Sequence, residues 1–183
     1  MNDVNKLRAG VREAADSLDQ AGARPGRAPA FTYVPPSHAK ALDPEATLVE
    51  GIRGAGKSFW WGQLASESHR EFVQAAFPEV RFNAKLKVAR GFGTGLESSE
   101  APSADVLAQL IDSYRPRSIW RAVLAFHAGF GGEFGELKRW SERVYWVQSH
   151  AEDFDELLDR ADQALDARGE TLLILFDALD RLA

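Results

Sequence analysis

The chain contains no cysteine, only one methionine and no long apolar run. Without cysteine it forms no disulfide and offers no thiolate for zinc or redox chemistry. No run approaches the roughly 20 consecutive apolar residues that a membrane-spanning helix needs. The start, MNDV, lacks the basic and then apolar layout of a secretory signal peptide. These absences predict a cytoplasmic protein without a membrane segment.

A large excess of charge of one sign is also missing. The 183 residues include 22 Lys and Arg and 27 Asp and Glu, which gives a net charge of -5. The chain therefore has no global basic field, and broad nucleic-acid binding is not indicated. Its 45% hydrophobic and 27% charged residues are ordinary for a globular protein, and the length suffices for one domain with a core.

One motif in the sequence indicates a binding site. Residues 51–58 read GIRGAGKS, which fits the phosphate-binding pattern G-x-x-x-x-G-K-[ST]. The short run TLVE before it is expected to form a strand over 47–51, and a helical pattern begins at Ser58. Glycines let the backbone N–H groups curl around an anion, and the helix adds the positive end of its dipole. The alternative is a glycine-rich turn that binds no ligand. The predicted nucleotide-binding residues are Gly51, Ile52, Arg53, Gly54, Ala55, Gly56, Lys57, Ser58 and Phe59.

Two side chains of this loop have specific predicted roles. Lys57 is expected to reach the outer phosphates of a nucleotide, and the Ser58 hydroxyl is expected to hold the Mg²⁺ that bridges them. A second half of the site is predicted near the end of the chain. Residues 171–176, TLLILF, are apolar at every position, which suits a strand covered on both faces in a parallel sheet.

Asp177 directly follows that run, at the strand end where open α/β sheets bind ligands. We expect Asp177 to share the coordination of Mg²⁺ with Ser58, through water, because this ion gives up its waters reluctantly. The alternative is that Asp177 only caps the helix that follows.

Together the two motifs resemble Walker A (51–58) and Walker B (172–177) of the P-loop NTPases. The continuation DALDRL over 177–182 resembles the D-x-L-D-[ER]-L pattern of STAND signal-transduction ATPases of the NACHT-like and KAP-like groups. Those are relatives of the AAA+ ATPases, and many act as regulators or in bacterial defence against phage. The resemblance covers two short stretches of the chain.

The chain departs from the pattern of many such ATPases at one position. They place a catalytic Glu directly after the Walker B Asp, whereas this chain has Ala178. The resemblance assigns the second acidic residue, Asp180, to positioning the attacking water, which makes Lys57 and Asp180 the candidate catalytic residues. The alternative is that Asp180 pairs with Arg181 or faces solvent.

Other segments are assigned more coarsely. Residues 3–21 are predicted to form an amphipathic helix and 22–30 a linker, so the predicted domains are 1–30 and 31–183. By resemblance, Tyr33 or Val34 touches the adenine; the alternative is an extended segment held by its aromatic side chains. An apolar stripe from Phe59 to Phe77 is expected to pack on the sheet. Further predictions are an edge strand over 80–89 with a basic row (Arg81, Lys85, Lys87), a loop from 91 to 102, helices over 104–114, 119–130 and 151–168, and an ambiguous segment over 135–150.

The predicted fold class is α/β, a three-layer P-loop NTPase fold with a mainly parallel sheet that is incomplete after the Walker B strand. The resemblance implies a further strand between the two Walker strands, and the sequence holds no candidate for it. We therefore expect the chain to be the N-terminal part of a longer protein. The alternative is that the two Walker strands are direct neighbours, as in kinases and GTPases.

The predicted function is binding of ATP with Mg²⁺, and slow hydrolysis used as a switch or motor. One alternative is a small-molecule or nucleotide kinase, for which Arg115, Arg117 and Arg121 would supply a lid. Another is a degenerate nucleotide-binding scaffold for protein interactions. GTP is disfavoured because no Asn-Lys-x-Asp sequence follows the loop. The expected partners are the nucleotide, other proteins or a second copy of the chain.

Overall fold

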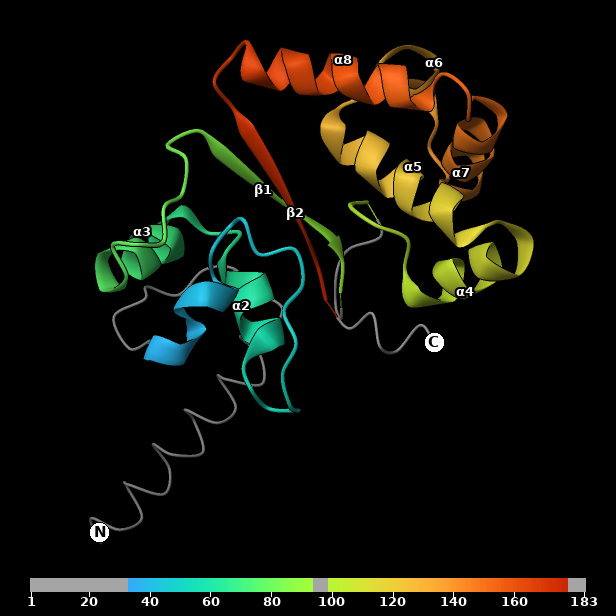
Figure 1. The fold of residues 1–183 in the computed structure, drawn as a ribbon. Coiled ribbons are helices and arrows are strands. Elements are labelled where there is room, and N and C mark those ends of the chain that lie inside the picture. Colours follow the sequence, from blue (N-terminus) through green and yellow to red (C-terminus); the bar gives the residue numbers. More distant parts are fainter. Residues whose placement is uncertain (1–32, 94–98, 178–183) are drawn as a thin grey trace, which may run out of the picture. The chain divides into compact units, whose positions relative to one another are not determined.

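The computed structural model describes residues 33–93 and 99–177. Contacts within the chain divide it into two compact units, one ending at Arg81 and the other beginning at Phe82. Figure 1 shows the elements of each unit. The predicted helix over 3–21, the predicted linker over 22–30 and Asp180 lie outside the described residues.

The described part of the first unit is built from short helices. A 3₁₀ helix, η2, spans Pro36–Ala41, with proline in its first turn, where a missing N–H costs nothing. Two α-helices follow, α2 (Lys57–Gln63) and α3 (Glu67–Ala76). The buried apolar side chains of this unit are those of Val34, Leu42, Trp60, Trp61, Leu64, Val73 and Val80. Several residues of the predicted stripe are thus buried, and α2 begins one residue before the predicted start.

The predicted strand over 47–51 is wrong. Residues 46–52 belong to no helix or strand. The side chains of Leu48 and Val49 are 73% and 40% exposed. A strand persists only where a neighbouring strand takes up its backbone hydrogen bonds, and two apolar residues between Thr47 and Glu50 supply little packing to hold one. The glycine loop therefore precedes a helix, as predicted, but does not follow a strand.

The second unit contains a two-stranded parallel sheet. Strand β1 (Leu86–Phe92) pairs with β2 (Thr171–Phe176), from Leu86 opposite Thr171 to Phe92 opposite Phe176. The strand β2 has the predicted bounds. The strand predicted over 80–89 begins later and ends later than expected, because a turn at Asn83 occupies its first part: the N–H of Leu86 donates to the carbonyl of Asn83, at 3.0 Å. Gly91 and Phe92, predicted to begin a loop, belong to β1.

Helices connect the two strands. In chain order they are α4 (Ala104–Ser113), α5 (Pro116–Ala128), α6 (Gly132–Glu136), α7 (Trp140–Ser149) and α8 (Phe154–Asp166). The Ser103 hydroxyl caps α4 by accepting from the N–H of Val106, which confirms the predicted cap. The helix α5 ends earlier than predicted, at Ala128, because Gly129 caps it with φ +77°. The ambiguous segment is mostly helical.

The main core of the second unit lies among its helices. Its fully buried members include Leu107, Ile119, Val123, Phe134 and Val144. The strand β2 is less covered than predicted: residues 172–175 are only half-buried and Phe176 is 37% exposed. Burial of β2 on both faces is therefore not found. The described fold combines helices with a small parallel sheet of two strands. The three-layer architecture stays a prediction.

Candidate functional site

The loop over 51–58 adopts a conformation that depends on its glycines. Gly54 and Gly56 both have φ +84°, in the left-handed region that side chains with a Cβ rarely adopt. Gly56 directly precedes α2 as its N-cap residue, and no side chain caps this helix end. The second and third glycines of the motif therefore have a structural reason to be glycine, which is the turn into α2.

Lys57 folds back across the loop. Its Nζ donates to the carbonyl oxygens of Gly51, at 2.5 Å, and Ile52, at 3.1 Å. A Cβ added at Gly51 would lie 3.4 Å from the Cβ of Ala55 and 4.0 Å from the Lys57 Nζ, so the two ends of the loop are close. An ammonium group has three N–H donors, and two are used here. The third is left for another acceptor, so the cation sits where the loop closes on itself.

Backbone N–H groups add to this set of donors. The N–H of Ala55 donates to the carbonyl of Ile52, at 3.2 Å, and closes a turn. Among the described residues no backbone acceptor takes the N–H groups of Gly54, Gly56 or Ser58. The first N–H groups of a helix have no partner within the helix. The exposed Ser58 hydroxyl lies beside them. Unpaired N–H groups, one ammonium and one hydroxyl are chemically suited to an anion with several oxygens.

His38, for which the sequence suggests no role, contacts the helix that follows the loop. Its Nδ1 accepts a hydrogen bond from the indole Nε1–H of Trp60, at 3.2 Å. A Cβ added at Gly56 would lie 4.0 Å from the His38 Cε1. The contact joins η2 to α2 beside the end of the loop. The sequence does not predict this contact, because the two residues are 22 positions apart and no local pattern links a histidine to a distant tryptophan.

Asp177 lies at the carboxyl end of β2. Its backbone N–H donates to the carbonyl of Phe92, at 2.9 Å, so the residue is held beside the end of β1. Its side chain is 9% exposed, and Oδ2 has no hydrogen-bond partner among the described residues. A buried carboxylate oxygen without a partner is costly unless it receives a cation or a donor. The chemistry fits a metal ligand acting directly or through water.

The two halves of the predicted site lie in different units. The loop over 51–58 belongs to the first unit and Asp177 to the second, and each is described by itself. Shared coordination of Mg²⁺ by Ser58 and Asp177 therefore stays a prediction. The described residues contain no group of three or more His, Asp or Glu side chains that could hold a metal ion.

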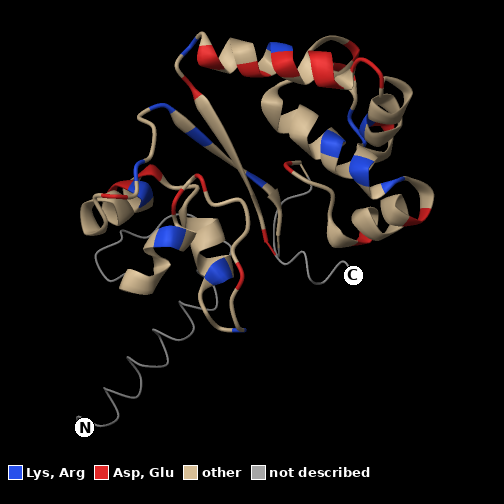
Figure 2. Ribbon diagram, in the orientation of Figure 1, with Lys and Arg blue, Asp and Glu red and all other residues tan. Residues whose placement is uncertain are grey.

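Two members of the basic row predicted over 80–89, Lys85 and Lys87, have partners within the protein. The Nζ of Lys85 donates to the carbonyl of Arg168, at 2.8 Å, and Lys87 forms an ion pair with Glu170, also at 2.8 Å. Figure 2 shows basic and acidic residues along the two strands and next to them. The hydrogen bonds from Lys87 and Arg168 lower the pKa of Glu170. These lysines hold the start of β1 next to the start of β2, which leaves them less suited to binding an acidic ligand.

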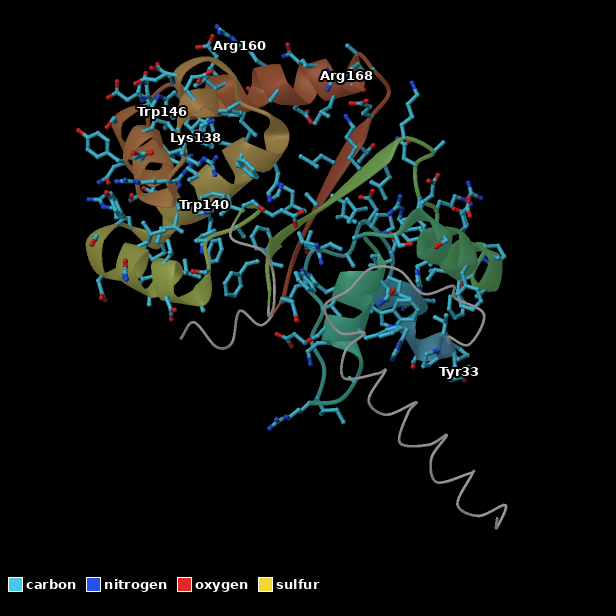
Figure 3. All side chains as sticks on the ribbon, turned by 180° about the vertical axis from the view of Figure 1, so that it is seen from behind. Tyr33, Lys138, Trp140, Trp146, Arg160 and Arg168 are labelled. Carbon is cyan, nitrogen blue, oxygen red and sulfur yellow. The ribbon has the colours of Figure 1, made fainter. Side chains whose placement is uncertain are left out.

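The structure also describes the residues predicted to contact adenine and one of the arginines predicted to form a lid. The Tyr33 side chain is 78% exposed (Figure 3). Val34 is buried. Contact of either residue with adenine stays a prediction. Of the arginines considered for a lid, Arg121 pairs with Asp155 at 2.7 Å and lies over the ring of Phe154. Arg121 is therefore committed to the packing of α5 on α8.

Across the part of the chain that the structure describes, no helix is long and apolar enough to cross a membrane. Comparison with known proteins identifies no relative: no family model, no curated protein and no solved structure matches the chain significantly. The function must therefore be argued from the residues of the two candidate half-sites.

Proposed function

We propose that this protein binds ATP with Mg²⁺ through the loop over 51–58 and hydrolyses it slowly as a switch or motor. The observation that carries the proposal is the position of Lys57, whose ammonium group spans a loop built on two left-handed glycines. A glycine-rich turn without a ligand needs the glycines, but it has no need for a lysine at that point. The pairing of both features supports a phosphate site.

Each group of the loop has a role in this proposal. The unpaired N–H groups and Lys57 bind the phosphate oxygens, and the Ser58 hydroxyl helps to hold Mg²⁺. Asp177 holds the same ion from the end of β2, which would account for the buried Oδ2 that has no partner among the described residues. When bound, Mg²⁺ would neutralise phosphate charge. Asp180 would orient the attacking water.

The proposal includes a fold and a location. The pair β1 and β2 with its helices would belong to a three-layer P-loop NTPase sheet, for which the parallel pairing and the acidic residue after β2 are the support. The resemblance to STAND and AAA+ ATPases would place the protein in the cytoplasm as a regulator or a defence protein. The lack of cysteine is compatible with that compartment.

The decisive experiment compares Lys57→Ala with Lys40→Ala by calorimetric titration with Mg-ATP. Lys40 is an exposed lysine of η2 and serves as the matched control. Loss of a charged hydrogen bond costs about 1.5–3 kcal/mol, so Lys57→Ala should weaken binding by about 10- to 150-fold. Lys40→Ala should bind like the parent. Equal affinity of all three proteins, with unchanged circular dichroism, would refute the phosphate site.

A further inference from the structure

The strand β2 has one edge that no strand of the described chain covers. The N–H of Thr171 donates to the carbonyl of Lys85 and that of Asp177 to Phe92, so the odd-numbered residues of β2 face β1. In a parallel ladder, successive residues direct their N–H and C=O groups to opposite edges. The N–H groups of Leu172, Ile174 and Phe176 therefore point to the other edge, where no described backbone acceptor takes them.

This edge also lacks the features that normally prevent pairing. Exposed edges are usually protected by a charged side chain, a proline or a bulge in the edge strand. The strand β2 reads TLLILF and contains neither a charge nor a proline, and the register shift of the sheet lies in β1, between Arg90 and Phe92. The edge is therefore open to another strand.

A groove of about 860 Å³ lies over the same strand. Its walls come from α5, α8 and β2, and the β2 side chains that line it are chiefly those of Leu172, Ile174 and Phe176. These side chains project from one face of the sheet, so the groove lies over that face of β2, and no lining residue belongs to β1. The edge with unpaired N–H groups thus adjoins a space walled by apolar side chains such as Leu124 and Leu158.

The charges around the groove are polarised along β2. Asp162 and Asp166, in the C-terminal half of α8, lie toward the start of β2, to which that helix leads. Arg117 lies one helical turn from Trp120, whose ring packs edge-on against Phe176 at 5.5 Å, near the end of β2. Ion pairs already engage Glu170 and Arg121, but none is found for these three residues within the described chain.

We propose that this edge binds an extended apolar peptide segment of a partner protein, which adds to the sheet as a strand parallel to β2. Its alternate side chains would fill the groove. A parallel strand places its N-terminal end near Asp162 and Asp166 and its C-terminal end near Arg117. The segment therefore carries a basic residue before its apolar core and an acidic residue after it, because opposite charges are favoured there.

Other occupants fit less well. A small apolar ligand would fill the groove but leave three N–H groups of the edge unpaired. A second copy pairing edge to edge about a twofold axis would run antiparallel. With the two β2 strands fully overlapped, Glu170 of one copy would face Asp177 of the other, and like charges directly opposite destabilise a sheet.

The test is amide hydrogen exchange on the whole chain with a synthetic probe, Lys-Val-Thr-Val-Thr-Val-Glu. The control peptide has the same composition with its two charged ends exchanged. At saturation the probe should slow exchange at the amides of Leu172, Ile174 and Phe176 by about tenfold or more, and leave Leu173 and Leu175 unchanged. The control should bind several-fold more weakly. No protection by the probe at millimolar concentration would overturn the proposal. Protection that rises with protein concentration alone would also overturn it, in favour of a second copy.

Two variants separate the edge from the groove. Leu172→Pro removes one outward N–H but none that donates to β1, so the thermal midpoint should change little while probe binding is lost. Arg117→Glu should weaken the probe several-fold, whereas Lys138→Glu, an exposed lysine outside the groove, should not. Unchanged probe binding by Arg117→Glu would contradict the predicted direction of the strand, even if Leu172→Pro failed to fold.

Discussion

Phe176 packs against Gly91 so closely that a Cβ added at Gly91 would lie 2.6 Å from the Phe176 ring. The side chain of Ile174 would lie 2.8 Å from the same Cβ. Gly91 sits at the register shift of β1, directly across from the end of β2. A glycine in a strand commonly marks such a close approach. The contact explains why this residue, predicted to begin a loop, belongs to the sheet.

The first prediction tests this contact. Gly91→Ala should lower the free energy of unfolding by about 1–3 kcal/mol, because the aromatic ring has to move to admit a methyl group. Gly131→Ala is the matched control, since a Cβ there meets nothing within 4 Å and its φ is ordinary. Urea denaturation of both variants measures the difference. Equal stability would show that β1 and β2 do not approach as closely as described.

The second prediction concerns the backbone of the phosphate loop. Gly56 has φ +84°, and the nearest atom to an added Cβ is 3.9 Å away, so any penalty comes from the backbone alone. Gly56→Ala should cost about 1–2 kcal/mol and weaken binding of Mg-ATP. Gly56→Asn should retain more of both, because asparagine tolerates the left-handed region better. Identical affinities for the two variants would argue that the loop changes shape on binding.

The third prediction separates the two acidic residues. Asp177→Asn removes a buried carboxylate whose Oδ2 has no partner among the described residues, so it should raise the thermal midpoint without Mg²⁺ and abolish the stabilisation that Mg²⁺ with ATP provides. Asp180→Asn should leave binding unchanged and slow hydrolysis by about 10²–10⁴-fold. Thermal scans and phosphate release measure the two effects. A parental rate for Asp180→Asn would remove its catalytic role, and a destabilised Asp177→Asn would indicate a structural role instead.

The fourth prediction is a pH dependence of stability. Burial lowers the pKa of His69, whose side chain is 2% exposed and whose Nδ1 has no partner in the described chain. The unfolded chain then binds more protons than the folded one as the pH falls through about 6.5, so stability decreases toward acid. Burial likewise lowers the pKa of His127, although the backbone carbonyls of Glu100 and Arg90 oppose the shift.

The measurement is urea denaturation at pH 7.5 and pH 5.5. His69→Gln should reduce the loss of stability between the two pH values, since it removes one of the groups that must be protonated on unfolding. A slope that His69→Gln leaves unchanged would mean that His69 binds protons equally in the folded and unfolded chain.

Local signals predicted several elements correctly. The hydroxyl of Ser103 caps α4, and Thr171 with the five apolar residues that follow it forms β2 at the predicted bounds. These features depend on residues within a few positions of one another, which is where capping and β-propensity operate. The turn from the glycine loop into α2 is also a local feature, because it depends on the left-handed conformation of a single residue, Gly56.

Errors arose where a distant partner decides the outcome. The run at Leu48 and Val49 has strand-like residues but no neighbouring strand in the described chain, so it forms none. The basic row over 80–89 has no partner nearby in the sequence, which leaves a solvated face as the default expectation, whereas Lys87 pairs with Glu170, 83 residues away. No local pattern encodes such a pairing.

The amino-acid sequence by itself determined which reactive and binding groups this protein has. They are a loop with glycines at 54 and 56 and a lysine at 57, and a carboxylate at 177 after an apolar strand. These are properties of short segments, whose backbone freedom and charge depend on residue type alone. Only the tertiary structure decided that Lys57 spans its loop, that His38 receives the Trp60 N–H, and that β2 keeps an open edge beside a groove. Each of these depends on which segments meet in space, and that follows from the packing of the whole chain.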